Sequence, residues 1–92
     1  MTGVNLSNAD LKNTNLTDAI LEGALLIRAK LNNAKLNNTN LIRANLEDAI
    51  ILVRIKLNNA KLVRADLTRA KLIFANLKGA NLEGANLTRA KF

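Results

Sequence analysis

The strongest constraint in this sequence is a leucine, or a close substitute, at every fifth position from Leu6 to Ile51 and again from Leu57 to Phe92. An α-helix turns by about 500° over five residues, so successive leucines would lie about 140° apart and form no stripe. A single strand alternates its side chains with period two, so an odd spacing would send consecutive leucines to opposite faces. The chain must therefore turn once in each unit, which predicts a β-solenoid.

A small residue, usually alanine, stands two positions before each leucine, and this spacing places both side chains on the same face of a short strand. The exceptions in the alanine position are Val4, Thr14, Thr39 and Ile55. Each unit reads A-(N/D/K)-L-x-x. We expect the alanine and the leucine inside the solenoid and the other three residues outside.

Tandem units of this kind resemble the pentapeptide-repeat family, whose units follow A-(D/N)-L-x-x, and here they extend over essentially the whole chain. The resemblance implies an all-β fold, a right-handed quadrilateral parallel β-helix with four units per coil and about four and a half coils. It also implies a single domain over residues 1–92. The handedness and the four units per coil come from the family and not from the spacing.

The pattern breaks once, where Ile51 and Leu57 are six residues apart. Ala49 keeps the first register, and Ile55 and Leu57 keep the second, so one residue within 50–54 is extra. We predict a β-bulge at a coil corner, since the stacking can resume on both sides. The bulk of Ile55, in a position usually held by alanine, is expected to fill space opened by this bulge.

Apolar residues at outward positions are rarer than polar ones and so more informative. One group falls on successive coils of one face and is a candidate for partner contact, while local cover over the bulge is an equal alternative. A smaller pair, Ile42 and Val63, stacks on the preceding face. The candidate contact residues are Ile50, Leu52, Val53, Ile73 and Phe74.

The last core position is held by Phe92, and no polar capping segment flanks the repeats, although stacked repeats normally need one. We expect the chain to form homo-oligomers, through its ends, where Phe92 would take part, or through a face. A truncated domain or a missing companion segment are the alternatives.

Fourteen Lys and Arg residues against seven Asp and Glu give a net charge of +7, which favours anionic partners. With four units per coil, some arginines stack at two corners, one of which also holds Asp48. A solvated ladder that partly neutralises itself is the alternative to anion binding. Nucleic-acid or other polyanion binding is therefore possible, but the chain has only two aromatic residues and its basic residues are spread over all four faces. The candidate anion contacts are Arg28, Arg43, Arg64, Arg69 and Arg89.

Catalysis is not expected, because the chain has no histidine and no cysteine and its carboxylates fall at outward positions. We predict no catalytic, cofactor-binding or metal-ligating residue. Some members of the resembling family protect DNA gyrase by mimicking duplex DNA, but that mechanism needs a negative surface and this chain is basic.

The sequence shows no signal peptide and no apolar run of the roughly 18–20 residues that a membrane span needs, so a cytoplasmic location is expected. Many members of the resembling family are bacterial, cyanobacterial ones especially. We predict a non-enzymatic structural or protein-interaction module, and the sequence does not identify its protein partner.

Overall fold

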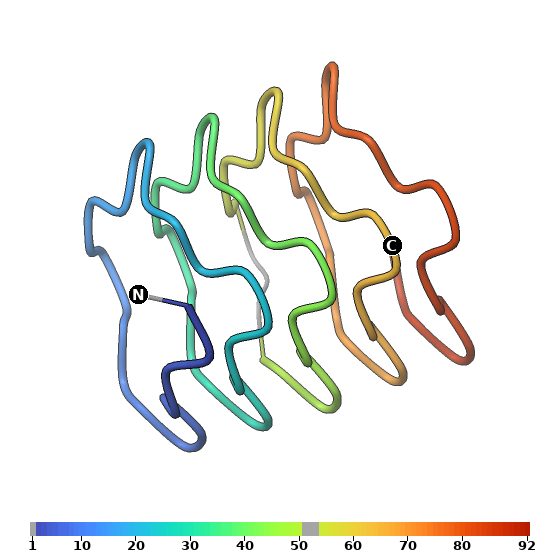
Figure 1. Cartoon of the computed structure of the whole chain (residues 1–92), viewed down its shortest axis with the longest axis horizontal. Helices are drawn as coiled ribbons and strands as arrows, with labels where there is room; N and C mark the ends of the chain where they lie inside the picture. Colours follow the sequence, from blue (N-terminus) through green and yellow to red (C-terminus); the bar gives the residue numbers. More distant parts are fainter. Residues whose placement is uncertain (1, 51–53) are drawn as a thin grey trace.

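The computed structural model describes residues 2–50 and 54–92. Within these ranges the chain contains isolated parallel β-bridges and turns, with no helix and no longer strand. Bridges join residues 20 apart, such as Asn5 with Leu25 and Leu25 with Asn45, so four five-residue units complete one coil. The chain therefore comprises about four and a half coils. The coils stack side by side in chain order, from the blue N-terminal coil to the red C-terminal coil (Figure 1).

A four-residue turn follows each bridge and forms a corner of the coil. At Ser7–Asn8, for example, the amide of Ala9 donates a hydrogen bond of 3.0 Å to the carbonyl of Leu6. The third turn residue has a positive φ at every described corner, 64° at Asn8. A positive φ at that position alone is typical of a type II turn. Asn, Asp and Gly adopt this backbone readily, which explains their frequency in the last position of the unit.

Successive coils are joined by backbone hydrogen bonds. The amide of Leu6 donates to the carbonyl of Leu25 over 2.7 Å, and the amide of Leu25 donates back to the carbonyl of Val4 over 2.8 Å. The same exchange recurs along the stack, so most strand-like backbone groups are paired between coils rather than within them.

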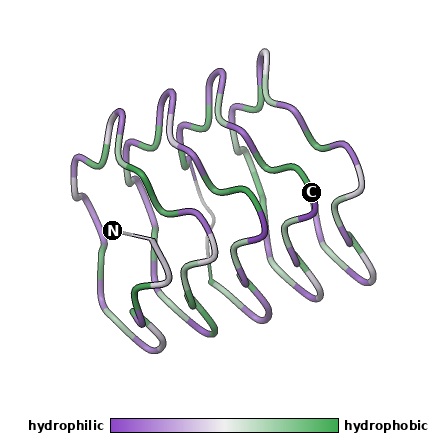
Figure 2. Cartoon of the chain, in the orientation of Figure 1, coloured by the Kyte–Doolittle hydropathy of each residue, from purple (hydrophilic) through white to green (hydrophobic). Residues whose placement is uncertain are grey.

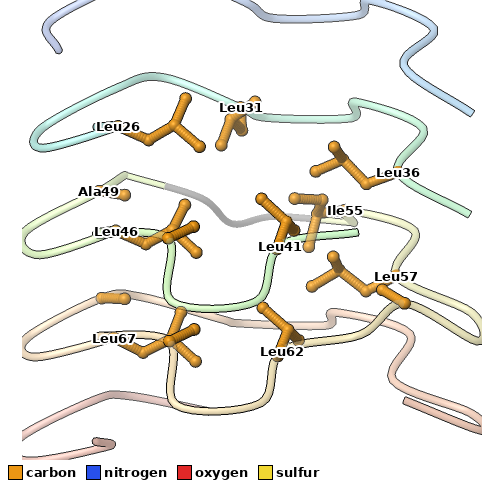
Figure 3. Close-up of a cluster of buried hydrophobic side chains, with 14 of the residues drawn as sticks. Leu26, Leu31, Leu36, Leu41, Leu46, Ala49, Ile55, Leu57, Leu62 and Leu67 are labelled. Carbon is orange, nitrogen blue, oxygen red and sulfur yellow. The ribbon is translucent and has the colours of Figure 1, made fainter. Parts of the chain in front are cut away.

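The interior is a stack of leucine and alanine side chains, as the five-residue pattern predicted. Leu26, Leu46 and Leu67 lie one above another in the close-up, and Ile55 points into the same interior (Figure 3). Each of these four side chains is at most 3% exposed. The space that remains between them is a cavity of about 10 Å³, lined by leucines and Ile55, which is at the lower limit for one water molecule.

Two threonines replace alanine in the interior because their hydroxyl groups find partners there. Thr39 is fully buried, and its Oγ1 donates to the carbonyl of Leu36 over 2.8 Å. Thr14, in the first coil, makes the same bond to Leu11 over 2.7 Å but is only partly buried. Each hydroxyl therefore enters the core without an unpaired polar atom.

The four sides of the coil are numbered in chain order, and each corner takes the number of the face that precedes it. Face 1 is centred on Leu6, Leu26, Leu46, Leu67 and Leu87, and face 2 on Leu11, Leu31, Leu72 and Phe92. Face 3 is centred on Leu16, Leu36, Leu57 and Leu77, and face 4 on Leu21, Leu41, Leu62 and Leu82.

The register of the stack changes once. Lys30 pairs with Ile50, 20 residues on, whereas Lys35 pairs with Lys56, 21 residues on. Lys56 then pairs with Asn76, and the spacing is 20 again. The stacking thus resumes in full after one additional residue.

Both neighbours of the additional residue keep regular positions. Ile50 bridges in the first register, and Arg54, with φ 69° and its amide donating to the carbonyl of Ile73 over 3.3 Å, ends a turn in the second. The additional residue therefore belongs to 51–53, which lie outside the described residues, as does the predicted bulge. Ile55, just beyond, is 1% exposed in the alanine position.

Candidate interaction surfaces

Among the residues that the structure describes, the cavity between the interior leucines is too small for a substrate or a cofactor. All seven carboxylate residues reach the surface. Within residues 2–50 and 54–92, no three histidine, cysteine or carboxylate residues gather closely enough to hold a metal ion. No helix in these ranges is long and apolar enough to cross a membrane. The features able to bind a partner are therefore on the outer surface.

Corner 1 carries a column of charged residues on successive coils, Arg28, Asp48, Arg69 and Arg89. Arg69 donates from Nε to Asp48 Oδ1 over 2.7 Å and from Nη2 to Glu47 Oε1, also over 2.7 Å. The hydrogen bond from Arg69 and its charge hold the pKa of Asp48 below its ordinary value, and the same bond raises the pKa of Arg69. One coil earlier, Arg28 Nε donates to Asn8 Oδ1 over 3.1 Å. Arg69 is thus neutralised within the molecule, whereas Arg28 and Arg89 at the same corner form no ion pair among the described residues.

Apart from Arg28, which bonds to Asn8, three of the candidate anion contacts form no ion pair among the described residues. Arg43 and Arg64 are exposed and lie on successive coils at corner 4. The stem of Arg64 covers Gly84, where a Cβ would lie 3.3 Å from Arg64 Cγ. Arg89 is exposed at corner 1 of the last coil. These arginines are accessible, but they lie at two different corners and form no compact cluster.

The outward apolar residues on face 2 include the most exposed large apolar side chain among the described residues. Phe74, at corner 2, is 79% exposed, Ile50 is 43% exposed, and Ile73 is partly exposed. The other two candidate contact residues, Leu52 and Val53, lie outside the described residues. Phe74 also has φ 59°, a conformation that is unfavourable for a bulky side chain.

Other apolar groups are more scattered. Ile42 and Val63 stack on face 4, two faces from face 2, so the prediction that they lie on the face directly preceding it was wrong; both are partly exposed. Ile20 and Leu25 are 56% and 38% exposed, and Phe92 is 67% exposed at the end of face 2. Figure 2 shows hydrophobic and hydrophilic residues alternating along the coils. Most of the described apolar side chains are buried or partly buried, and few large ones are exposed.

Charge is distributed unevenly between the faces, which the sequence pattern alone did not reveal. Basic residues occur on all four faces, as expected, but five of the seven acidic residues lie on faces 1 and 4. Faces 2 and 3 together hold eight basic residues and only Asp10 and Asp18, so they carry six of the seven net charges. We call these eight residues the basic sector: Lys12, Lys30, Lys35, Arg54, Lys56, Lys71, Lys78 and Lys91.

The family was identified by comparison with known sequences. The sequence model for pentapeptide repeats matches the chain in eight copies, over residues 1–36, 24–52 and 50–89. The chain belongs to the pentapeptide-repeat family, and both the predicted family and the right-handed quadrilateral β-helix are confirmed. No curated protein matches the chain.

Two solved structures of cyanobacterial pentapeptide-repeat proteins are similar to the chain. HetL from Nostoc sp. strain PCC 7120, involved in heterocyst differentiation regulation, is 34% identical with a TM-score of 0.89, over 98% of this chain and 43% of HetL. Rfr23 from Cyanothece 51142 is 35% identical with a TM-score of 0.74, over 100% of this chain and 63% of Rfr23. The chain thus spans less than two thirds of the length of either protein.

Proposed function

We propose that the chain is a non-enzymatic protein-interaction module, a rigid solenoid that binds a protein partner through face 2 around Phe74. The observation that carries this proposal is the backbone of Phe74. A left-handed conformation costs a residue other than glycine roughly 1–2 kcal/mol, and at 79% exposure the ring recovers little of this by burial. Asn13, Asn33 and Arg54 occupy the same corner in earlier coils with the same positive φ, so the fold does not require an aromatic residue there.

The surroundings of Phe74 support a contact surface. Ile73 precedes it in the same turn, and Ile50 lies on the same face one coil earlier. An exposed aromatic with neighbouring aliphatic side chains is the usual centre of a protein interface. Regulation, the role described for HetL, is one that a binding module can serve.

The alternatives have weaker support. Single-stranded nucleic acid is normally bound by several aromatic platforms, and this chain has only Phe74 and, one coil later on the same face, Phe92. Mimicry of DNA toward gyrase needs an extended negative surface, whereas no face of this chain carries a net negative charge.

The proposal is tested by capture of partners from the organism that encodes the chain. The wild type is compared with the double variant Ile73→Glu, Phe74→Glu and with a matched control, Ile42→Glu, Val63→Glu, on face 4. We expect at least one protein to bind the wild type and the control but not the face 2 variant, and to bind again when purified. Identical partner sets for all three chains would overturn the proposal.

We also propose that the 92-residue chain self-associates through its end coils. Leucines of the first and last coils are only partly buried, and Phe92 is 67% exposed at a core position. Stacking of two ends would bury these side chains and pair open backbone groups. Sedimentation equilibrium is expected to show a dimer or a larger species that Phe92→Asp weakens. A wild type that stays monomeric at high concentration would contradict this proposal.

A further inference from the structure

We propose that the protein partner presents an acidic surface, which the basic sector on faces 2 and 3 holds around the apolar contact at Phe74. This inference rests on the proposed function, since it concerns the partner of the same surface. It goes further by assigning the chemistry of that partner and by adding face 3 to the interface.

Four lysines of the sector are stacked in two pairs on adjacent coils, whereas Lys30 bridges to Asp10. Lys35 and Lys56 form a parallel bridge, and so do Lys71 and Lys91, which places like charges on adjacent coils, about 4.8 Å apart. All four are exposed. Apart from Lys12, which lies 3.8 Å from Asp10, no residue of the sector forms an ion pair among the described residues.

Corner 1 gives a comparison, because some of its charged residues form ion pairs within the chain. There an arginine stands beside two carboxylates and is neutralised by them. The stacked pairs Lys35 with Lys56 and Lys71 with Lys91 form no ion pair among the described residues, and like charges side by side are mildly destabilising in the isolated chain. A surface that accumulates uncompensated charge of one sign is suited to a surface of the opposite sign.

The apolar and basic features are interleaved on face 2. Ile50 bridges to Lys30 in the preceding coil, and Lys71 donates its amide to the carbonyl of Ala49, beside Ile50, from the following coil. Ile50 therefore stands between two lysines in one column. An apolar centre with a charged rim is the general form of a protein interface, and here the rim is cationic.

Two other partners, a second copy of the chain and a nucleic acid, fit the surface of faces 2 and 3 less well. A second copy packed face to face would place the same lysines against one another, because the two patches of a two-fold interface are identical. A nucleic acid would be served by charge alone and gives no role to the isoleucines and the strained Phe74. An acidic protein surface uses both features.

The test measures binding of fluorescently labelled chain to defined probes. The probes are a random copolymer of glutamate and tyrosine, poly-glutamate, duplex DNA and a single-stranded oligonucleotide. The variants are Lys35→Glu, Lys56→Glu in the sector and the matched control Arg43→Glu, Arg64→Glu at corner 4. Both pairs are exposed and stacked on adjacent coils, and both change the net charge equally. Circular dichroism verifies the fold of each variant.

We expect the copolymer to bind better than poly-glutamate and better than either nucleic acid. The sector variant should weaken copolymer binding by about tenfold or more, and the control by less than about threefold. Equal losses would show that only net charge matters and would overturn the inference, as would tighter binding of a nucleic acid or no binding of the copolymer.

A third variant separates this inference from the proposed function. Ile73→Ser, Phe74→Asn removes the apolar contact and leaves the charge unchanged. If it binds the copolymer as the wild type does while the sector variant fails, the apolar contact is wrong and the acidic partner remains. If both charge variants lose binding equally while Ile73→Ser, Phe74→Asn lowers it, the acidic partner is wrong and the apolar contact remains.

Discussion

The middle coils and the end coils have the same leucine pattern, but their leucines are buried to different extents. Leu67 and Leu87 belong to one column of face 1, yet Leu67 is 1% exposed and Leu87 is only partly buried. A side chain in the middle has a coil on each side, whereas one in the last coil has a neighbour on one side only. The stability of a stacked repeat therefore depends on its neighbours as much as on its own sequence.

The largest expected effect separates the two regions directly. Leu67→Ala should lower the free energy of unfolding by about 3–5 kcal/mol, because it leaves a cavity between two coils. Leu87→Ala should cost about 1–2 kcal/mol, because water already reaches that position. Urea unfolding of both variants measures the difference. Equal losses would mean that the end coil is as well packed as the middle.

A second comparison uses the two aliphatic residues that replace alanine. Ile55 is 1% exposed in the middle, and Val4 is partly buried in the first coil. Ile55→Ala should cost about 2–4 kcal/mol, even though it restores the residue typical of this position. Val4→Ala should cost less than about 1 kcal/mol. A neutral Ile55→Ala, measured by urea unfolding, would show that the isoleucine does not fill space next to the register change.

The two interior threonines are expected to show a smaller difference in stability between the middle and the first coil. Thr39→Ala removes a fully buried hydroxyl bonded to Leu36, and we expect a loss of about 1–2 kcal/mol. Thr14→Ala removes the same bond from a partly solvated position, where water replaces it, so the loss should stay below about 1 kcal/mol. Thermal unfolding at one pH distinguishes them. A greater loss at Thr14 would contradict the burial argument.

The smallest expected effect is the loss of stability at low pH. Because the folded pKa of Asp48 is lowered, chiefly by its hydrogen bond with Arg69, the pair stabilises the fold above the unfolded value of about 3.9. That stability declines as the pH falls through the folded pKa. The contact between Arg28 and Asn8, nearer the N-terminus, involves no carboxylate, although the charge of Arg28 adds a smaller contribution to the lowered pKa of Asp48.

Thermal unfolding between neutral pH and about pH 2 tests this. We expect Asp48→Asn to lose stability less steeply with acid than the wild type does, and Arg69→Gln to behave in the same way. Parallel curves for the three chains would mean that this exposed pair adds no measurable stability.

Most of the fold followed from local pattern. The odd spacing of leucine excluded helix and single strand, and the alanine two residues earlier assigned the interior, which the burial of Leu67 and Ile55 confirms. Even the single extra residue could be counted from the sequence. These features are local, because the five residues of one unit determine which of its side chains face the interior and which face the solvent.

The neighbours of each surface residue depended on pairings between residues far apart in the sequence. Whether Arg69 meets Asp48, or Lys35 meets Lys56, depends on a spacing of 20 residues that becomes 21 across the register change. The basic sector became visible only when charges of both signs were assigned to faces through these pairings. The sequence by itself determined one turn in each unit, a leucine core and the outward position of Phe74. The tertiary structure decided which charges form ion pairs and which do not, because the stacking of coils, and not the order along the chain, sets the neighbours of each outward side chain.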